Sequence, residues 1–292
     1  IEVRSIVEMQ YNCFSTQIIP ALERNSIKIH QYDTLPQSVK DELTLYMNEQ
    51  IIPVLTPRAV DPSHPQPFLK NLSSYIIIKF FESELAIYTE QLIGFVEIPN
   101  VLNRLVPISI NKNRFDFVLL EQLIIASLPQ LFVGFTPHIT SIVRVTRNLE
   151  YVLTEQKISN LRKTIEEKLS YREQQGAVRL EVSSDCPEAF INIFTKMLRI
   201  HKKFVFKTPH PVSLGGLEQL CNLNLPTLKE LPFNPRIPSK LANCTNIFKL
   251  IKSSDLLVHH PFDSFYTVIE FLNEAALDPS TLAIKQTLYR SA

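Results

Sequence analysis

Apolar residues recur at helical spacing in the first fifty positions and predict two helices. Residues 6–22 have this pattern, and Pro20 is expected to kink or end the helix. We interpret this segment as the last helix of a region that begins upstream. A second helix is expected after Pro36, with Ser38 as its N-cap and Asp41 completing an arrangement that resembles a capping box. One face of the second helix carries Val39, Leu43, Met47 and Ile51.

A proline-dense run divides these helices from a region with strand-like patterns. Five prolines in residues 53–67 exclude a helix and a central strand, so an ordered extended loop or a linker is expected. The strand-like segments that follow are 74–81, 94–98, 141–147 and 178–182. Helices are expected at 116–128 and 154–169. Because helices and strands mix without a regular βαβ alternation, the expected fold class is α+β.

The pattern changes again after a cluster of three prolines in residues 231–238, where we place a domain boundary. A short apolar strand at 256–260 is expected first, followed by a helix capped by Asp263 or Ser264. A second strand is expected at 281–289. These three elements form one βαβ unit of a sheet whose remaining strands are missing.

Composition and charge narrow the classes of function. The 292 residues include 30 Lys or Arg and 29 Asp or Glu, so the formal net charge is +1 and no global field attracts nucleic acid. The five glycines form neither a GxGxxG nor a GxxxxGK motif, so any phosphate must be bound by side-chain cations. Four cysteines without CxxC spacing fit reduced thiols in a cytosolic protein. The longest apolar stretch, 118–135, is interrupted by Glu121 and cannot span a bilayer.

A few residues in the expected C-terminal unit suggest phosphate chemistry. Arg290 ends the last expected strand, where open α/β sheets bind ligands, and its guanidinium suits phosphate or carboxylate oxygens. A surface ion pair is the alternative. Lys285, in the middle of that strand, needs a partner or an edge position. His259 and His260 end the preceding strand; histidines bonded to backbone groups are the alternative to a binding role. His64, in the proline-dense run, either has a function or braces a turn.

Three arginines of the central region form a second candidate site. Arg144, Arg147 and Arg179 would make a basic patch if their strands are neighbours, and a solvated sheet face is the alternative. No nucleophilic-serine elbow, HExxH, DFG or HRD motif occurs in the sequence. Metal binding is disfavoured, because no second cluster of ligands lies at useful spacing from the paired histidines.

Taken together, segments along the chain resemble bacterial polyphosphate kinases of the first type. The segment 54–68, with Asn71-Leu-Ser73 after it, resembles the signature loop of that family. The other segments that match, in order, are 143–148 and 177–181 of the head domain, and 256–265 and 278–290 at the start of the catalytic region. The matches cover most of the chain, which is identified as a fragment of such a kinase.

The resemblance implies a domain map and a location. Residues 1–27 correspond to the end of an N-terminal helical domain, 28–236 to the head domain, and 237–292 to the start of the first C-terminal catalytic domain. The implied fold is a mixed α+β head, flanked by a helical remnant and an incomplete βαβ unit of a phospholipase-D-like α/β domain. The implied location is the bacterial cytoplasm, with or without peripheral attachment to the inner membrane.

The implied activity is reversible transfer of the γ-phosphate of ATP to polyphosphate through a phosphohistidine. Arg290 corresponds to an arginine of the family's Mg²⁺–nucleotide and phosphate site. Because a guanidinium is a donor and not a metal ligand, we expect it to contact phosphate oxygens with magnesium nearby. Lys285 is assigned to the same phosphate site. The phosphate-accepting histidine lies beyond residue 292 in the family pattern, so neither His259 nor His260 is that residue, and the chain alone is expected to be inactive.

The expected partners are ATP, ADP and inorganic polyphosphate in a homo-oligomer, without nucleic acid and without a transmembrane segment. One alternative is a non-catalytic module that binds polyphosphate and mediates dimerisation. Another is a phospholipase-D-type hydrolase, which is disfavoured because no HxK motif occurs in the sequence. The sequence leaves the oligomeric state and the net direction of the reaction open.

Overall fold

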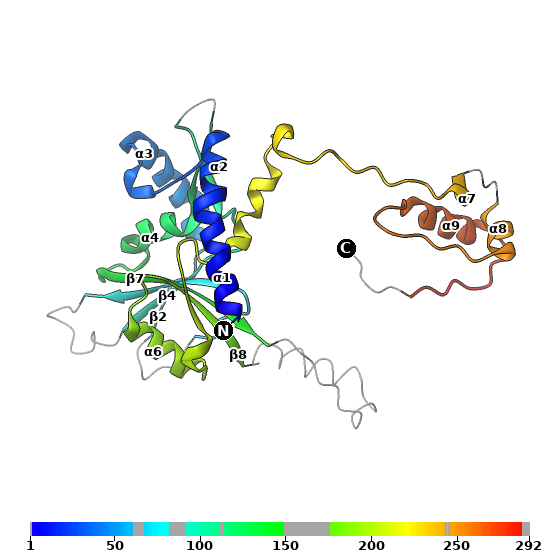
Figure 1. Cartoon of the computed structure of the whole chain (residues 1–292). Helices are drawn as coiled ribbons and strands as arrows, with labels where there is room; N and C mark the ends of the chain where they lie inside the picture. The colour runs from blue at the N-terminus through cyan, green and yellow to red at the C-terminus, as the bar shows by residue number, and fades with distance from the viewer. Residues whose placement is uncertain are drawn as a thin grey trace, which may run out of the picture. The chain divides into compact units, whose positions relative to one another are not determined.

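The computed structural model describes the chain in two compact units, 1–223 and 224–292 (Figure 1). The described residues are all except 1, 61–66, 82–91, 111–113, 149–175, 243, 245 and 288–292. Helices and mixed sheets occur together, which confirms the α+β class. The domain limits expected at residues 27 and 236 stay predictions. The helix expected at 154–169 lies outside the described residues.

The N-terminal segment forms one continuous helical rod, although Pro20 was expected to kink or end it (Figure 1). The rod consists of α1 (Glu2–Cys13), the π-helical turn η1 (Phe14–Ile18) and α2 (Ile19–Arg24). A proline lacks the backbone N–H that an α-helix needs at an interior position. The π-helical turn directly before Pro20 changes the hydrogen-bond pattern there, and the helix continues for another turn.

The next helix, α3 (Gln37–Tyr46), begins two residues earlier than expected. Its N-cap is Pro36 without a side-chain cap, so the prediction that Ser38 is the N-cap was wrong. Asp41 accepts a hydrogen bond from the side-chain amide of Gln37 at 2.9 Å instead. The π turn η3 (Met47–Ile51) and the 3₁₀ turn η4 (Ile52–Val54) extend the helix. The expected apolar face is confirmed, because its four members are buried: Val39, Leu43, Met47 and Ile51.

A six-stranded sheet is the centre of the first unit. Its strand order is β2-β4-β3-β7-β8-β9, and all pairs are antiparallel except β8 with β9. The strands are β2 (Arg58–Val60), β3 (Ser74–Phe80), β4 (Ile93–Glu97), β7 (Pro137–Arg147), β8 (Ala177–Ser183) and β9 (Val205–Thr208). The four strands expected here are confirmed. Within the described part of the proline-dense run, Arg58–Val60 form the edge strand β2, which was not expected but which a proline-rich segment permits.

A three-stranded sheet with the order β1-β6-β5 lies in the same unit. Its members are β1 (Ile27–His30), β5 (Leu105–Ile108) and β6 (Phe115–Leu119). The helix expected at 116–128 was therefore placed too early, because α4 runs from Leu120 to Leu131 and a strand precedes it. A short apolar run has no period that separates a buried strand from a helix, which accounts for the error.

Helices cover both faces of the six-stranded sheet and create two apolar cores. Ile76 and Ile78 of β3 pack with residues of α3 and α4 on one face. Tyr75 and Ile77 point to the other face and pack with α6 (Glu188–Met197), which connects the parallel strands β8 and β9. Figure 1 shows α4 and α6 on opposite sides of the sheet. β3 is buried on both faces, which makes it the central strand of the unit.

The second unit is helical in its described part. It contains α7 (Ser239–Ala242), α8 (Ile247–Ser253) and α9 (Tyr266–Leu277). The N-cap of α9 is Phe265 without a side-chain cap, so the prediction that Asp263 or Ser264 caps this helix was wrong. Oγ of Ser264 accepts a hydrogen bond from the amide of Tyr266 at 3.2 Å instead. Strands were expected at 256–260 and 281–289. The structure has no strand at 256–260 or at 281–287, so the prediction was wrong there, and 288–289 lie outside the described residues. Among the described residues no strand pairs with these segments, and a strand forms only by pairing.

Within the described parts of the chain, no helix combines the length and apolar character that a bilayer span requires.

The buried face of α3 gives a stability prediction with a control on the same helix. Leu43 is 4% exposed and Leu45 is 64% exposed. We expect Leu43→Ala to lower the free energy of unfolding by about 2–5 kcal/mol, because it leaves a cavity in the core. Leu45→Ala should change it by less than about 0.5 kcal/mol. Urea unfolding of both variants measures the difference, and equal losses would contradict the assigned face.

Candidate functional site

The structure describes some of the residues that the sequence selects for phosphate chemistry. Arg290 and His64 lie outside the described residues. Lys285 is exposed in the extended segment 281–287, and its role in binding phosphate stays a prediction. His259 and His260 lie in a turn of the second unit.

A single carboxylate organises the turn that contains both histidines. Asp263 accepts hydrogen bonds from the backbone amide of His259 at 2.8 Å and from Nε of Arg236 at 2.9 Å. Nδ1 of His260 lies 2.8 Å from the carbonyl oxygen of Asp263. Because a carbonyl oxygen only accepts, Nδ1 carries the proton of this bond. His260 is therefore a histidine bonded to the backbone, which was the alternative to a binding role.

The three central arginines do not form one patch, although β7 and β8 are neighbours. Arg144 and Arg179 both pair with Glu181, at 2.6 and 2.8 Å. The guanidinium of Arg147 donates to the carbonyl of Leu69 at 2.8 Å and lies 4.2 Å from the ring centre of Phe68. Burial lowers the pKa of Arg147. These contacts bind the three guanidinium groups to other groups of the same chain.

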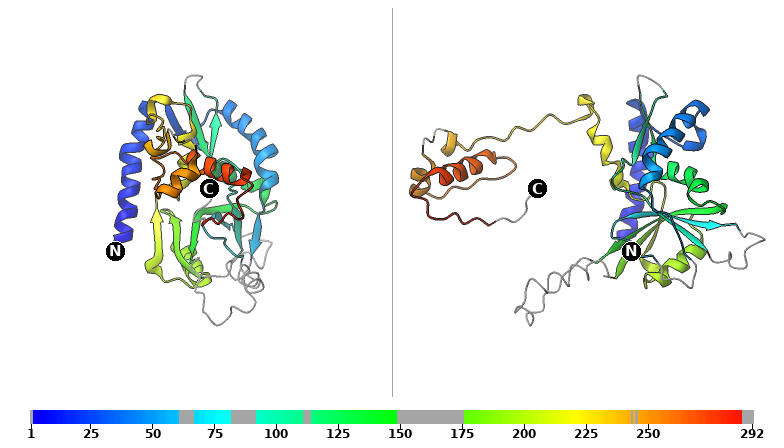
Figure 2. Two further views of the ribbon diagram at one scale, coloured as in Figure 1. Left: turned by 90° about the vertical axis from the view of Figure 1, so that its right-hand side faces the viewer. Right: turned by 180° about the vertical axis from the view of Figure 1, so that it is seen from behind.

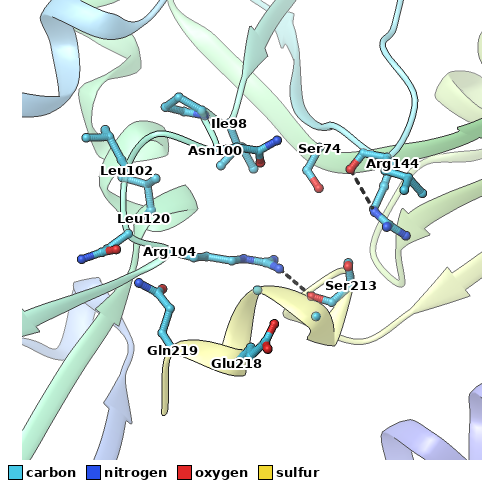
Figure 3. Close-up of a pocket in the computed structure, with 15 residues that line it drawn as sticks. Ser74, Ile98, Asn100, Leu102, Arg104, Leu120, Arg144, Ser213, Glu218 and Gln219 are labelled. Carbon is cyan, nitrogen blue, oxygen red and sulfur yellow. Dashed lines mark hydrogen bonds between the residues drawn. The ribbon is translucent and has the colours of Figure 1, made fainter. Parts of the chain in front are cut away.

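A pocket of about 410 Å³ lies between the start of β3, the end of β4 and the 3₁₀ helix η8 (Leu214–Asn222) (Figure 3). Its polar side chains are Ser74, Asn100, Asn103, Arg104, Arg144, Ser213, Glu218 and Gln219. Figure 3 shows the side chain of Arg104 reaching across the pocket toward Ser213, with Ser74 and Arg144 on the opposite wall. The pocket therefore contains two guanidinium groups and several uncharged hydrogen-bonding groups.

Arg104 is a largely buried residue that connects two segments distant in sequence. Its Nη2 donates to Oε1 of Glu121 at 2.6 Å, and its Nε lies 3.2 Å from both oxygens of that carboxylate. Nη1 and Nη2 also donate to the carbonyls of Ser213 and Val212. The side chains of Glu121 and Arg104 are 2% and 12% exposed. One guanidinium thus joins the first turn of α4 to the segment before η8.

Two residues with left-handed backbone line the pocket, and an arginine binds the carbonyl of each. Leu72 has φ 60° and Ser213 has φ 66°, values that are unfavourable for residues other than glycine. Nε of Arg144 donates to the carbonyl of Leu72 at 3.2 Å, while Arg104 holds that of Ser213. The amide of Ser213 also donates to the hydroxyl of Tyr11 at 2.9 Å. These bonds hold the strained backbone in place.

The pocket is suited to an uncharged polar ligand more than to a triphosphate. Both guanidinium groups already have carboxylate partners, and Glu218 adds a negative charge. The described lining residues include no histidine that could act as a base or accept a phosphoryl group. In the described part of the chain, no three His, Cys, Asp or Glu side chains gather to hold a metal ion.

The sequence analysis did not identify the Arg104–Glu121 pair. Glu121 was noted only as an interruption of an apolar stretch. A carboxylate within apolar residues of a folded protein requires a buried partner, so this signal points to an ion pair. The partner lies 17 positions earlier, before β5, and no local pattern in the sequence identifies it.

Adjacent glycines in η8 allow a matched test of the contacts of Arg104. A Cβ on Gly216 would overlap Cδ of Arg104 and lie 2.9 Å from its Nη1, whereas a Cβ on Gly215 would meet its nearest atom at 3.9 Å. Gly216→Ala should displace Arg104 and lower the free energy of unfolding by about 1–3 kcal/mol. Gly215→Ala should change it by less than about 0.5 kcal/mol. Urea unfolding tests this, and equal effects would show that Arg104 is not fixed.

The turn around Asp263 is expected to depend on pH. Hydrogen bonds from the His259 amide and from Arg236 hold the pKa of Asp263 below its ordinary value of 3.8. Such a carboxylate stabilises the fold above its unfolded pKa, and this contribution disappears as the pH falls through the folded pKa. Hydrogen-exchange protection of the His259 amide, corrected for intrinsic exchange, should therefore fall below about pH 4. Asp263→Asn should remove this pH dependence, and an unchanged profile in that variant would contradict the assignment.

Comparison with known proteins gives matches along most of the chain. The sequence model of the "Polyphosphate kinase middle domain" matches residues 39–220, and that of the "Polyphosphate kinase C-terminal domain 1" matches residues 246–292. The polyphosphate kinase of Burkholderia multivorans is 34% identical over 289 residues, which cover 98% of this chain and 42% of that protein. The enzyme of Mycobacterium avium is 35% identical over 291 residues, which cover 96% and 40%.

A solved structure supports the same relationship at the level of the fold. The crystal structure of polyphosphate kinase from Porphyromonas gingivalis has a TM-score of 0.72 and 20% sequence identity, and the match covers 95% of this chain and 40% of that chain. The chain thus spans about two fifths of the length of its curated relatives. Since the middle-domain match alone includes more than half of its residues, the chain belongs to the polyphosphate kinase family.

Proposed function

We propose that the complete protein transfers the γ-phosphate of ATP reversibly to inorganic polyphosphate through a phosphohistidine. The observation that supports this most strongly is the order of the two family matches, middle domain first and C-terminal domain 1 second. Because the chain spans about two fifths of its relatives, the activity is assigned to the whole protein and not to residues 1–292 alone.

The proposed chemistry needs a nucleophile in line with the leaving group and positive charge on the transferred phosphoryl group. In the first step, a neutral imidazole nitrogen attacks the γ-phosphorus of ATP, and the bond to ADP breaks. In the second step, a terminal oxygen of polyphosphate attacks this phosphorus, and the imidazole leaves. We propose that this imidazole lies beyond residue 292, as the family resemblance implies. The backbone bond of His260 agrees with a structural role for that residue.

Arg290 and Lys285 are proposed to bind the phosphate groups. A guanidinium offers a planar pair of donors to phosphate oxygens, and an ammonium adds a point charge. Lys285 is exposed, so its ammonium is accessible to a ligand. Magnesium bound to ATP would neutralise part of the phosphate charge. The described residues do not gather a set of magnesium ligands, so they do not fit a metal site and no step here depends on one.

The proposed partners are ATP, ADP and inorganic polyphosphate, and we propose that the complete protein is a homo-oligomer. We place it in the bacterial cytoplasm, with or without peripheral attachment to the inner membrane. The absence of a bilayer-spanning helix among the described residues is compatible with this placement.

A second candidate function is a non-catalytic module that binds polyphosphate and mediates dimerisation. One observation favours polyanion binding by the first unit. Residues 189–217 contain no Asp or Glu, although five Lys or Arg residues lie in the same range. This function is compatible with catalysis elsewhere in the complete protein.

Substitution of Arg290 tests the proposed enzyme. In the complete protein, Arg290→Ala should lower the turnover of ATP-dependent polyphosphate synthesis by about 10²-fold, because it removes a cation that stabilises the transition state. Arg24→Ala, which removes an exposed arginine of α2, should have less than about a twofold effect. A loss of less than about threefold for Arg290→Ala would indicate a structural role. No synthesis by the unmodified complete protein would favour the non-catalytic alternative.

A further inference from the structure

Positive charge is concentrated in one stretch of the first unit, although the chain as a whole is nearly neutral. From position 189 to position 217 no acidic residue occurs. Five cations of this stretch are exposed: Lys196, Arg199, Lys202, Lys203 and Lys207. They lie in the last turn of α6, in the turn after it, in the 3₁₀ turn η7 (Lys202–Phe204) and on β9.

The N-terminal helix brings a sixth cation beside this stretch. Nη2 of Arg4 donates to the carbonyl of Val205 at 3.1 Å and lies 3.4 Å from that of Lys203. Figure 2 (left) shows the N-terminal end of α1 beside β9. Two segments separated by about 200 positions are thus brought together through these bonds. We call the group of Arg4, Lys196, Arg199, Lys202, Lys203 and Lys207 the basic surface.

The charge of the basic surface is only partly neutralised. Glu188 lies 3.0 Å from the ammonium of Lys207 and 3.8 Å from that of Lys202, so two lysines share one carboxylate. The hydrogen bond from Lys207 lowers the pKa of Glu188. Within the described residues, no carboxylate lies at ion-pair distance from the other four members of the surface. This contrasts with Arg104 and Arg144, whose charges are committed to Glu121 and Glu181.

The chemistry of the basic surface favours a flexible chain of phosphates over a nucleic acid. Four of its six members are lysines, and a lysine binds phosphate as a point charge without a fixed orientation. Single-stranded nucleic acids additionally need open aromatic faces on which bases stack. Phe204 is the exposed aromatic residue of this stretch, at 42%, and the ammonium of Lys203 lies 5.0 Å from its ring centre. That ring face is already occupied by a cation.

We infer that the basic surface is a binding site for inorganic polyphosphate on the first unit. The inference rests on the proposed function, which makes polyphosphate the substrate of the complete protein. Each cation contacts internal phosphates of the chain and releases counterions on binding, so the affinity falls as the salt concentration rises. Neither Arg290 nor the expected phosphohistidine takes part in this contact.

The experiment compares two double variants that remove equal charge from the untagged 292-residue chain. K202Q/K203Q changes the basic surface, and K249Q/K252Q changes two exposed lysines of α8 in the second unit. Binding of long-chain inorganic polyphosphate is measured by titration at about 50 mM and about 200 mM salt. K202Q/K203Q should bind at least about tenfold more weakly at the lower salt and show a smaller salt dependence. K249Q/K252Q should stay within about twofold of the unmodified chain.

Three outcomes would overturn the inference. The first is unchanged binding by K202Q/K203Q, and the second is an equal loss in both double variants, which would indicate diffuse charge attraction. The third is binding of poly(U) RNA as tight as that of polyphosphate and equally sensitive to K202Q/K203Q, which would indicate a nucleic-acid surface. Circular dichroism confirms that both variants are folded. If the complete protein synthesises no polyphosphate from ATP, the proposed function fails separately, because the titration does not depend on activity.

Discussion

The buried ion pair between Arg104 and Glu121 is the interaction on which the first unit depends most. The Arg104 guanidinium binds the carboxylate at the start of α4 and the carbonyls of Val212 and Ser213. Its own carbonyl accepts a hydrogen bond from the amide of Leu120, which adds a backbone link to the same helix. Removal of one partner from a buried pair leaves an uncompensated charge and typically costs about 3–5 kcal/mol. The wall of the polar pocket is built on these contacts.

The segment that Arg104 binds also connects the N-terminal helix α1 to the rest of the first unit. Tyr11 of α1 donates to the carbonyl of Pro211 at 3.0 Å and accepts from the amide of Ser213 at 2.9 Å. The same segment is held from its other side by Arg104. Arg4, two turns earlier on α1, binds carbonyls beside β9. Hydrogen bonds to backbone groups and the packing of Tyr11 against Phe206 therefore hold α1 against β9, which adds Arg4 to the basic surface.

Cations in this molecule divide into those used for structure and those left for a ligand. Arg104, Arg144 and Arg179 have carboxylate partners, and the first two also bind strained or irregular backbone. Lys196 and Lys203 are exposed and have no such partner among the described residues. Planar guanidinium groups suit the structural use, because they can bind several acceptors in fixed directions. Exposed lysines suit the binding of a ligand.

The sequence was sufficient to predict a helix or strand where one local pattern determines that element. The apolar face of α3 and the alternation in β7 and β8 were predicted correctly. The proline-dense run was expected to be a loop or linker, and the edge strand β2 within it was not predicted. β6 was assigned to a helix because a short apolar run is compatible with either element, and its partner β1 lies more than 80 positions away. The strands expected in the second unit depend on partners that the described residues do not supply. Arg104 and Glu121 meet only through the tertiary fold.

A double-mutant cycle between Arg104 and Glu121 tests the central claim most directly. The free energy of unfolding is measured for the 292-residue chain, for Arg104→Met, for Glu121→Gln and for the double variant. If the pair joins these segments as described, the two substitutions are coupled by about 1–3 kcal/mol, and the double variant is more stable than the sum of the single effects predicts. Additive effects, within about 0.5 kcal/mol, would contradict the claim that this ion pair holds the unit together.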